Sequence, residues 1–141
     1  MTTQTKTRLR QGFGGQATWR KVKLGEVLKI RRGASPRPIH DYIKKSGMPW
    51  LKIADVTGSD SRFVDATKEF IKEDGVSKSV VVRPGDLVLS NSATPGIPRF
   101  MRITACVHDG WLILEPINDF SRFQLFYRFE SRSYAHHCPH R

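Results

Sequence analysis

Short apolar segments, separated by stretches rich in proline and glycine, are the feature that most restricts how this chain can fold. The longest apolar runs, such as residues 80–82 and 111–114, are far too short to span a bilayer. Several segments alternate apolar and polar residues with the period of a β-strand, and strong turn signals lie between them. The sequence therefore predicts an α+β fold, a mainly β domain with short helices and two long ordered loops.

The individual elements follow from the same patterns. We expect strands or short helices in the following order: a strand from Val22, a helical turn at 25–27, a strand into Ile30, a helix at 39–45, and strands at 48–56, 80–83, 87–90 and 100–107. The dipeptide Asp109-Gly110 predicts a two-residue hairpin turn, with 111–114 as the return strand. One amphipathic helix is compatible with residues 120–129.

The chain has 141 residues, which suffice for one domain with a real core and are too few for two ordinary ones. Residues 1–18 have few apolar anchors, so we expect a disordered leader there. We expect the domain to occupy residues 19–116, followed by a helical remnant and a frayed tail at 117–141. With two cysteines and no apolar signal segment, a cytoplasmic protein without a disulfide framework is the expectation.

The charge points to a polyanionic partner. Lysine and arginine number 24 against 13 acidic residues, which gives a net charge of +11. Such an excess repels itself in the folded state, so a nucleic acid is the first candidate partner. An anionic membrane surface is the second candidate, although no basic amphipathic helix is visible, and a merely soluble or ribosome-like basic protein is the third.

Two loops carry the side chains that suit such a partner. The first, at residues 31–38, places three arginines on a backbone stiffened by two prolines, and arginine can pair with a phosphate or with the guanine edge. The second, at residues 90–99, offers hydroxyl and amide groups for phosphates and base edges. Loops of this composition are also ordinary connections, so it is their combination with the charge that favours DNA contact. The candidate DNA-binding residues are Arg31, Arg32, Ser35, Arg37, Tyr42, Lys44, Lys45, Ser90, Asn91, Ser92, Thr94 and Arg99.

Three strings in this order resemble one protein family. They are Trp19 with VKLGEV at 22–27, GMPWLKIADV at 47–56, and VRPGDLVLS at 82–90 followed by the Thr94-Pro95-Gly96 loop. Together they resemble the target-recognition domains of type I restriction–modification specificity subunits, over roughly residues 19–115. Gly85 and Asp86 match the family's turn, for which we expect a structural role.

The resemblance implies a non-catalytic domain that reads one half of a bipartite site in double-stranded DNA. It also implies partnership with modification (methyltransferase) and restriction subunits. S-adenosylmethionine and ATP chemistry belong to those subunits, so we expect no cofactor here. Family members carry two such domains and long helices, whereas no heptad helix is evident here, so we expect a truncated subunit that could self-associate. The alternative is a non-functional or partner-docking fragment that does not bind DNA by itself.

Enzymatic and metal readings are weaker. The tail at 136–140 contains potential zinc ligands, but they crowd one terminal stretch, and a structural site needs ligands held by two elements. Cys106 and His108 could suggest a nucleophilic site, yet Asp109 is needed for the turn and Cys106 is better explained as a small buried apolar residue. We therefore expect neither a catalytic residue nor a metal ligand.

Overall fold

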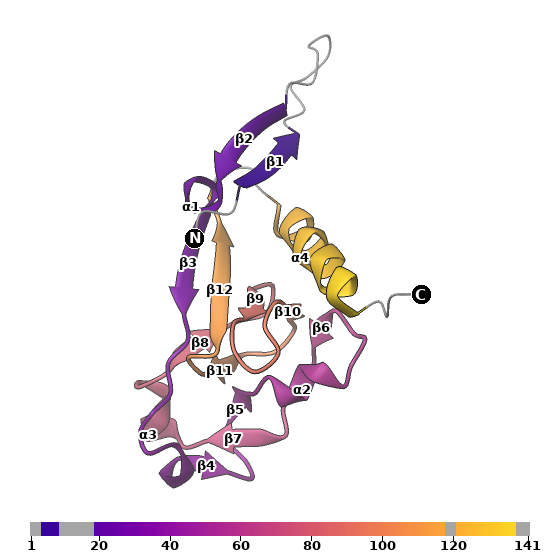
Figure 1. Cartoon of the computed structure of the whole chain (residues 1–141). Coiled ribbons are helices and arrows are strands. Elements are labelled where there is room, and N and C mark those ends of the chain that lie inside the picture. The colour runs from indigo at the N-terminus through magenta and orange to yellow at the C-terminus, as the bar shows by residue number, and fades with distance from the viewer. Residues whose placement is uncertain (1–3, 9–18, 118–120, 138–141) are drawn as a thin grey trace.

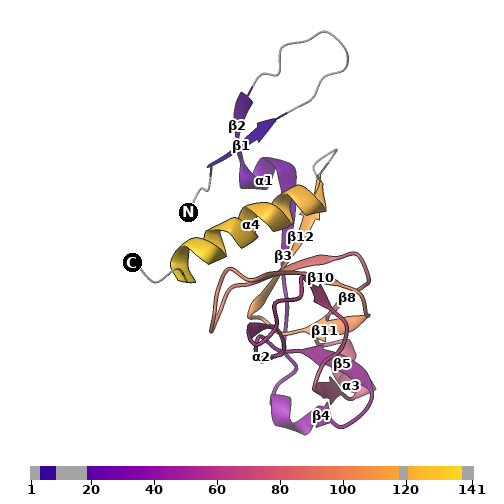
Figure 2. The ribbon, with the colours of Figure 1, turned by 90° about the vertical axis from the view of Figure 1, so that its right-hand side faces the viewer.

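Two five-stranded sheets packed against each other form the centre of the computed structural model, which describes residues 4–8, 19–117 and 121–137 (Figures 1 and 2). The first sheet has the order β3 (Leu28–Arg32), β12 (Trp111–Pro116), β9 (Leu87–Ser90), β10 (Pro98–Met101) and β6 (Phe63–Val64). The second has the order β4 (Ile43–Lys44), β7 (Glu69–Ile71), β5 (Met48–Leu51), β11 (Ala105–Val107) and β8 (Val80–Val82). Each sheet contains one parallel pair among antiparallel ones, β10 with β6 and β11 with β5.

Helices are short and peripheral apart from the last one. They are α1 (Leu24–Val27), the 3-10 turn η1 (Ile39–Asp41), α2 (Ala54–Thr57), α3 (Glu73–Val76) and α4 (Arg122–His137). The predicted fold class, α+β and mainly β, is confirmed. No helix among the described residues is both long and apolar enough to cross a membrane.

The period-2 alternation of β12 shows how the layers are held together. Trp111 and Ile113 are fully buried between the two sheets, whereas Leu114 faces the opposite side. There it packs with Leu125 and Phe126 of α4, which runs across the first sheet (Figure 2). The centre of the first sheet is therefore buried on both faces, which explains why β9 and residues 111–114 of β12 lack a polar side.

Residues 4–8, which we expected to lie in a disordered leader, form strand β1 (Gln4–Arg8). β1 pairs antiparallel with β2 (Trp19–Lys23), and the pair projects beyond α1 (Figure 1). Threonines at positions 5 and 7 favour an extended backbone, and the partner strand satisfies its hydrogen bonds. The remaining residues of the predicted leader lie outside the described part.

Two predicted elements of the first half were wrong in extent. The helix expected at 39–45 is only the turn η1, because Ile43 pairs with Ile71 and draws the chain into the second sheet. The strand expected at 48–56 ends at Leu51. Beyond it the Lys52 N–H donates a hydrogen bond to the Asp55 carboxylate (2.8 Å), at the start of the short helix α2.

The strand expected at 100–107 is two strands in different sheets, β10 and β11. The turn at Asp109-Gly110 is tight, but it joins β11 of the second sheet to β12 of the first, so no hairpin forms there. Alternation alone fixes which face a residue takes and not which sheet its strand joins. Cys106 of β11 is buried as expected.

The helix α4 is longer than predicted and includes residues 131–137, which we had placed in a frayed tail. An apolar pattern is visible only up to Phe129, but residues 131–137 contain neither glycine nor proline, and the helix continues through them. The division into leader, domain and remnant remains a prediction.

Candidate nucleic-acid interface

The turn at residues 108–110 is where the two predicted loops meet. From the first loop, the Gly33 N–H donates to the Trp111 carbonyl (2.9 Å). From the second loop, the Asn91 N–H donates to the Gly110 carbonyl (2.9 Å). The two loops are therefore adjacent in space, on either side of one turn, and we call the combined surface of residues 32–37, 91–95 and 108–110 the loop junction.

Two glycines make this close approach possible. A Cβ atom at Gly33 would overlap the main-chain oxygen of His108, and one at Gly110 would overlap the Ser92 hydroxyl oxygen. At Gly33 the neighbours are backbone atoms, so any side chain there would displace the loop or the turn. At Gly110 they are side chains, so the Ser92 hydroxyl and the His108 ring would have to move. The close approach of the first loop therefore depends on glycine at position 33.

Polar side chains of the first loop converge on Asp109 at the tip of the turn. The Ser35 hydroxyl donates to Asp109 Oδ1 (3.1 Å), and Arg37 Nη2 lies 3.7 Å from Oδ2. Arg32 Nε donates to the Asp109 main-chain oxygen (2.9 Å). Chiefly because of the Ser35 hydrogen bond, and also because of Arg37, the pKa of Asp109 is lowered. Arg37 itself stays 76% exposed, so its guanidinium remains available to a ligand.

The partly buried side chain of His108 stabilises the turn. Its Nδ1 accepts a hydrogen bond from the Gly110 N–H (2.8 Å), and its ring packs against that of Trp50. Burial lowers the pKa of His108, with Lys52 adding to the effect and Asp109 opposing it. A neutral imidazole is thereby favoured, and only that form can accept the hydrogen bond from Gly110.

A second group of predicted residues extends from the first loop. The Tyr42 ring packs on Gly75, and its hydroxyl accepts a hydrogen bond from Lys78 Nζ (2.6 Å), which raises the pKa of Lys78. Lys44 on β4 and Lys45 beyond it are exposed. Gly75 also neighbours Pro36, so Tyr42 and Lys78 lie beside the first loop, whereas Lys44 and Lys45 are related to it only by their place in the sequence.

Arg31 and Thr94 have local partners. Arg31 forms an ion pair with Glu115 across β3 and β12 (Nη2 to Oε1, 2.8 Å). The Thr94 carbonyl accepts a hydrogen bond from the Ser90 hydroxyl (2.7 Å). Both side chains remain partly exposed: Thr94 belongs to the loop junction, and Arg31 directly precedes it in sequence.

Ser90 and Arg99 do not join the surface, contrary to our expectation. Ser90 is 2% exposed, and its hydroxyl also accepts a hydrogen bond from the Ile97 N–H (2.9 Å). The buried hydroxyl therefore links two positions of the second loop to each other. Arg99 points away toward α2, where Nη2 donates to the carbonyls of Ser59 (2.8 Å) and Val56 (3.3 Å). Burial lowers the pKa of Arg99. Both side chains brace the fold instead.

Sequence reasoning missed four residues of this region: His108, Asp109, Lys52 and Lys78. Asp109 was assigned only to a turn, because the Asp-Gly signal says nothing about what packs around it. Lys52 and Lys78 lie far from the loops along the chain, so only the tertiary structure relates them to His108 and Tyr42.

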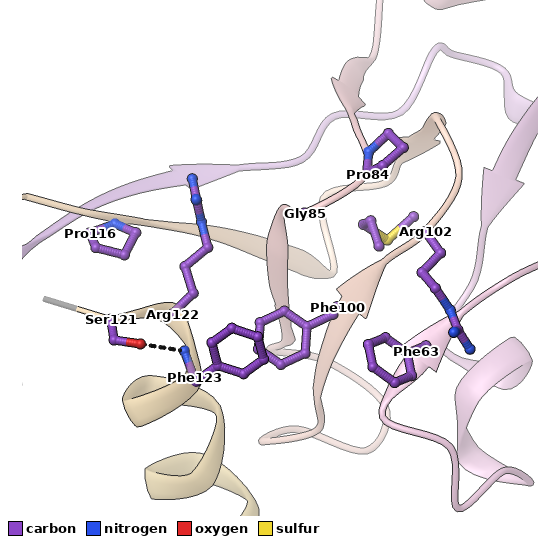
Figure 3. Close-up of a pocket in the computed structure, with 10 residues that line it drawn as sticks. Phe63, Pro84, Gly85, Phe100, Arg102, Pro116, Ser121, Arg122 and Phe123 are labelled. Atoms are coloured by element: carbon purple, nitrogen blue, oxygen red, sulfur yellow. Dashed lines mark hydrogen bonds between the residues drawn. The ribbon is translucent and has the colours of Figure 1, made fainter.

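A separate apolar groove of about 680 Å³ lies at the start of α4 (Figure 3). Rings of Phe63, Phe100 and Phe123 line it, with Phe100 and Phe123 centroids 5.1 Å apart. Arg102 and Arg122 add positive charge to the same groove. Phe123 is 60% exposed, which is unusual for a phenylalanine.

Among the described residues, no group of three or more histidine, cysteine or acidic side chains is arranged to hold a metal ion. Part of the tail considered above, residues 138–140, lies outside the described part.

The chain is therefore an α+β domain, mainly β, in which two packed sheets carry ordered basic loops. It is similar to the HsdS subunit from Thermoanaerobacter tengcongensis, with 27% identity and a TM-score of 0.65 over 83% of this chain and 28% of that one. A second solved specificity subunit, from work on complex assembly and conformational transition of the type I R-M system, gives 25% identity and a TM-score of 0.67 over 89% of this chain and 30% of that one.

These likenesses confirm the resemblance seen in the sequence: the chain is similar in fold to specificity subunits of type I restriction–modification systems. It spans less than a third of the length of either solved chain. No family model and no curated protein matches the sequence.

Proposed function

We propose that this chain binds double-stranded DNA sequence-specifically, as the target-recognition part of a type I specificity subunit. The observation that carries the proposal is the loop junction, where two loops far apart in the sequence meet on one turn. Their exposed side chains combine cations for phosphates with amides and hydroxyls for base edges: Arg32, Arg37, Asn91 and Ser92. A chain of net charge +11 gains non-specific attraction to the same partner.

In this role the chain is a non-catalytic cytoplasmic component without a cofactor of its own. It would direct modification and restriction subunits to one half of a bipartite site, and two copies could associate to complete the recognition unit. The likeness to specificity subunits supports these partners.

The test is duplex affinity across a salt series for the wild type, for Arg37→Ala, and for the charge-matched control Arg128→Ala. Arg128 is an exposed residue of α4, outside the loop junction. If Arg37 neutralises one phosphate, its loss should make the slope of log K against log salt shallower by about 0.9. The control should leave slope and affinity unchanged.

Equal effects of the two substitutions would remove the first loop from the interface and leave only diffuse charge attraction. Absence of any duplex binding by the wild type, at low salt and with the protein folded, would contradict the proposal itself.

A second candidate function is protein docking without DNA binding, and the apolar groove at α4 favours it. Phe123 (60% exposed) and Tyr127 (52% exposed) lie one helical turn apart and extend the apolar surface from the groove along α4. Under this reading, Phe123→Asp should abolish co-purification of the modification subunit and leave duplex affinity intact. Intact co-purification by that variant would remove the groove from the interface.

A further inference from the structure

We propose that the Asp109 carboxylate is a specificity-determining group that accepts a hydrogen bond from the N4 amino group of a cytosine in the major groove. The inference rests on the proposed DNA-binding function and adds to it one residue and one base. Neither sequence patterns nor the list of predicted contacts pointed to Asp109.

The carboxylate is central to the loop junction. It sits on the turn to which both loops are hydrogen-bonded, and its side chain is 48% exposed. A ligand that touches both loops must pass over this turn. A double helix lying on Arg37 and Asn91 would therefore bring base edges to Asp109.

The carboxylate has an acceptor to offer. Oδ1 accepts the Ser35 hydrogen bond (3.1 Å). Oδ2 lies 3.7 Å from Arg37 Nη2, which is an ion pair but longer than a hydrogen bond. Among the described residues no other residue donates a hydrogen bond to Oδ2, and an ionised carboxylate accepts through both oxygens.

The contacts with neighbouring arginines do not explain why residue 109 has a carboxylate. Arg32 donates to the main-chain oxygen of residue 109, a bond that any residue there would provide. Arg37 remains largely exposed and is held only loosely. An acidic group repels the phosphates of a duplex, and the Ser35 hydrogen bond and the long ion pair with Arg37 leave Oδ2 able to accept a donor from the ligand. An amino group on a base supplies one.

The same charge excludes other bases. Cytosine presents the N4 amino donor in the major groove, whereas guanine presents O6 and N7 and thymine presents O4, all of them acceptors. An acceptor facing an ionised carboxylate loses hydration without gaining a hydrogen bond. Adenine offers its N6 amino group beside the N7 acceptor, so it is the one alternative donor. Hydrogen bonding to Ser35 keeps the pKa of Asp109 low, and the carboxylate therefore stays an acceptor at neutral pH.

The experiment selects duplexes from a randomised library with the full chain, comparing the wild type with Asp109→Asn and Ser35→Ala. We expect one position in the wild-type site to prefer cytosine by between about 5-fold and 150-fold. Asp109→Asn keeps an oxygen for Ser35 and places an amide donor at the Oδ2 position. Its preference there should move from cytosine to a base with acceptors, while other positions stay unchanged. Ser35→Ala removes a support of the carboxylate but not the carboxylate, so it should weaken the cytosine preference without reversing it.

Thermal unfolding of each variant verifies that it is folded. A uniform loss of affinity with an unchanged site in Asp109→Asn would make Asp109 a positioning residue and overturn the proposal. Adenine at the position would overturn the assignment to cytosine. If the wild type binds no duplex at all, the proposed function fails together with this inference, whereas selective binding that ignores residue 109 refutes the inference alone.

Discussion

Replacing Gly33 by alanine tests whether the loop junction is a built structure. Gly33 is buried in the first loop, and a Cβ atom there would overlap the main-chain oxygen of His108 and lie 2.7 Å from that of Val107. Both neighbours are backbone atoms of the strand end and the turn, which cannot rotate away as a side chain would. The loop must therefore move outward from the turn.

The cost follows from the hydrogen bonds that this movement breaks. Two are made by the loop backbone, from Gly33 N–H to the Trp111 carbonyl (2.9 Å) and from Ala34 N–H to the Val107 carbonyl (3.1 Å). At about 1 kcal/mol each, their loss lowers the free energy of unfolding by roughly 2 kcal/mol. Keeping the bonds and accepting the overlap would cost a similar amount, about 1–3 kcal/mol.

The assay is urea unfolding together with duplex affinity. With an m value of about 2 kcal/mol/M, the expected shift of the midpoint is about 1 M. The matched control is Gly25→Ala in α1, where nothing lies within 4 Å of the added Cβ and the substitution should be neutral or slightly stabilising. Equal midpoints for Gly33→Ala and Gly25→Ala would refute the close packing of loop and turn. If Gly33→Ala loses stability but keeps full duplex affinity, the first loop is not part of the interface.

Two further predictions concern His108 and Arg99. Burial lowers the pKa of His108 below its usual 6.5, so on acidification the unfolded chain binds a proton at this histidine before the folded chain does. The free energy of unfolding should therefore fall as the pH drops below about 6.5 and level off below the pKa of the folded state. Urea unfolding as a function of pH measures this, and His108→Gln, which can still accept from Gly110, should flatten that part of the curve. Arg99→Lys should lower the free energy of unfolding by about 1–2 kcal/mol, because an ammonium group cannot span the carbonyls of Val56 and Ser59, and should leave the salt slope of duplex binding unchanged. A shallower slope in Arg99→Lys would return Arg99 to the interface.

The fold class was predictable because the local pattern of apolar and polar residues indicates where strands lie and which of their faces are buried. In β12 the short apolar run from Trp111 to Leu114, which follows the Asp109-Gly110 turn signal, indicates a strand buried on both faces. Which sheet a strand joins is a non-local property. Residues 100–107 read as one continuous strand, yet β10 pairs with β9 and β11 pairs with β8, because the chain crosses from one sheet to the other.

The candidate site was predictable in part for the same reason. Composition identified the two loops, since proline, glycine and arginine have local meaning. It did not reveal that Ser90 points inward or that Arg99 turns back to α2, because both depend on partners distant in the sequence. Asp109 was missed because its importance comes from what surrounds it.

At the loop junction, backbone hydrogen bonds largely determine the shape, whereas side chains determine what the surface can bind. Several of the bonds that join the loops to the turn run between backbone groups, as from Asn91 N–H to the Gly110 carbonyl, and would survive almost any change of side chain. The bond from the Ser35 hydroxyl to the Asp109 carboxylate would not. Packing against backbone atoms requires glycine at 33, and packing against the Ser92 and His108 side chains favours it at 110. Exposed positions such as 91 and 92 can therefore change their hydrogen-bonding groups at little cost to stability, and Asn at 109 would keep an oxygen for Ser35. On such a surface, substitutions that change which base is preferred should be common and substitutions that unfold the protein rare, which is the opposite of what a buried catalytic site would show.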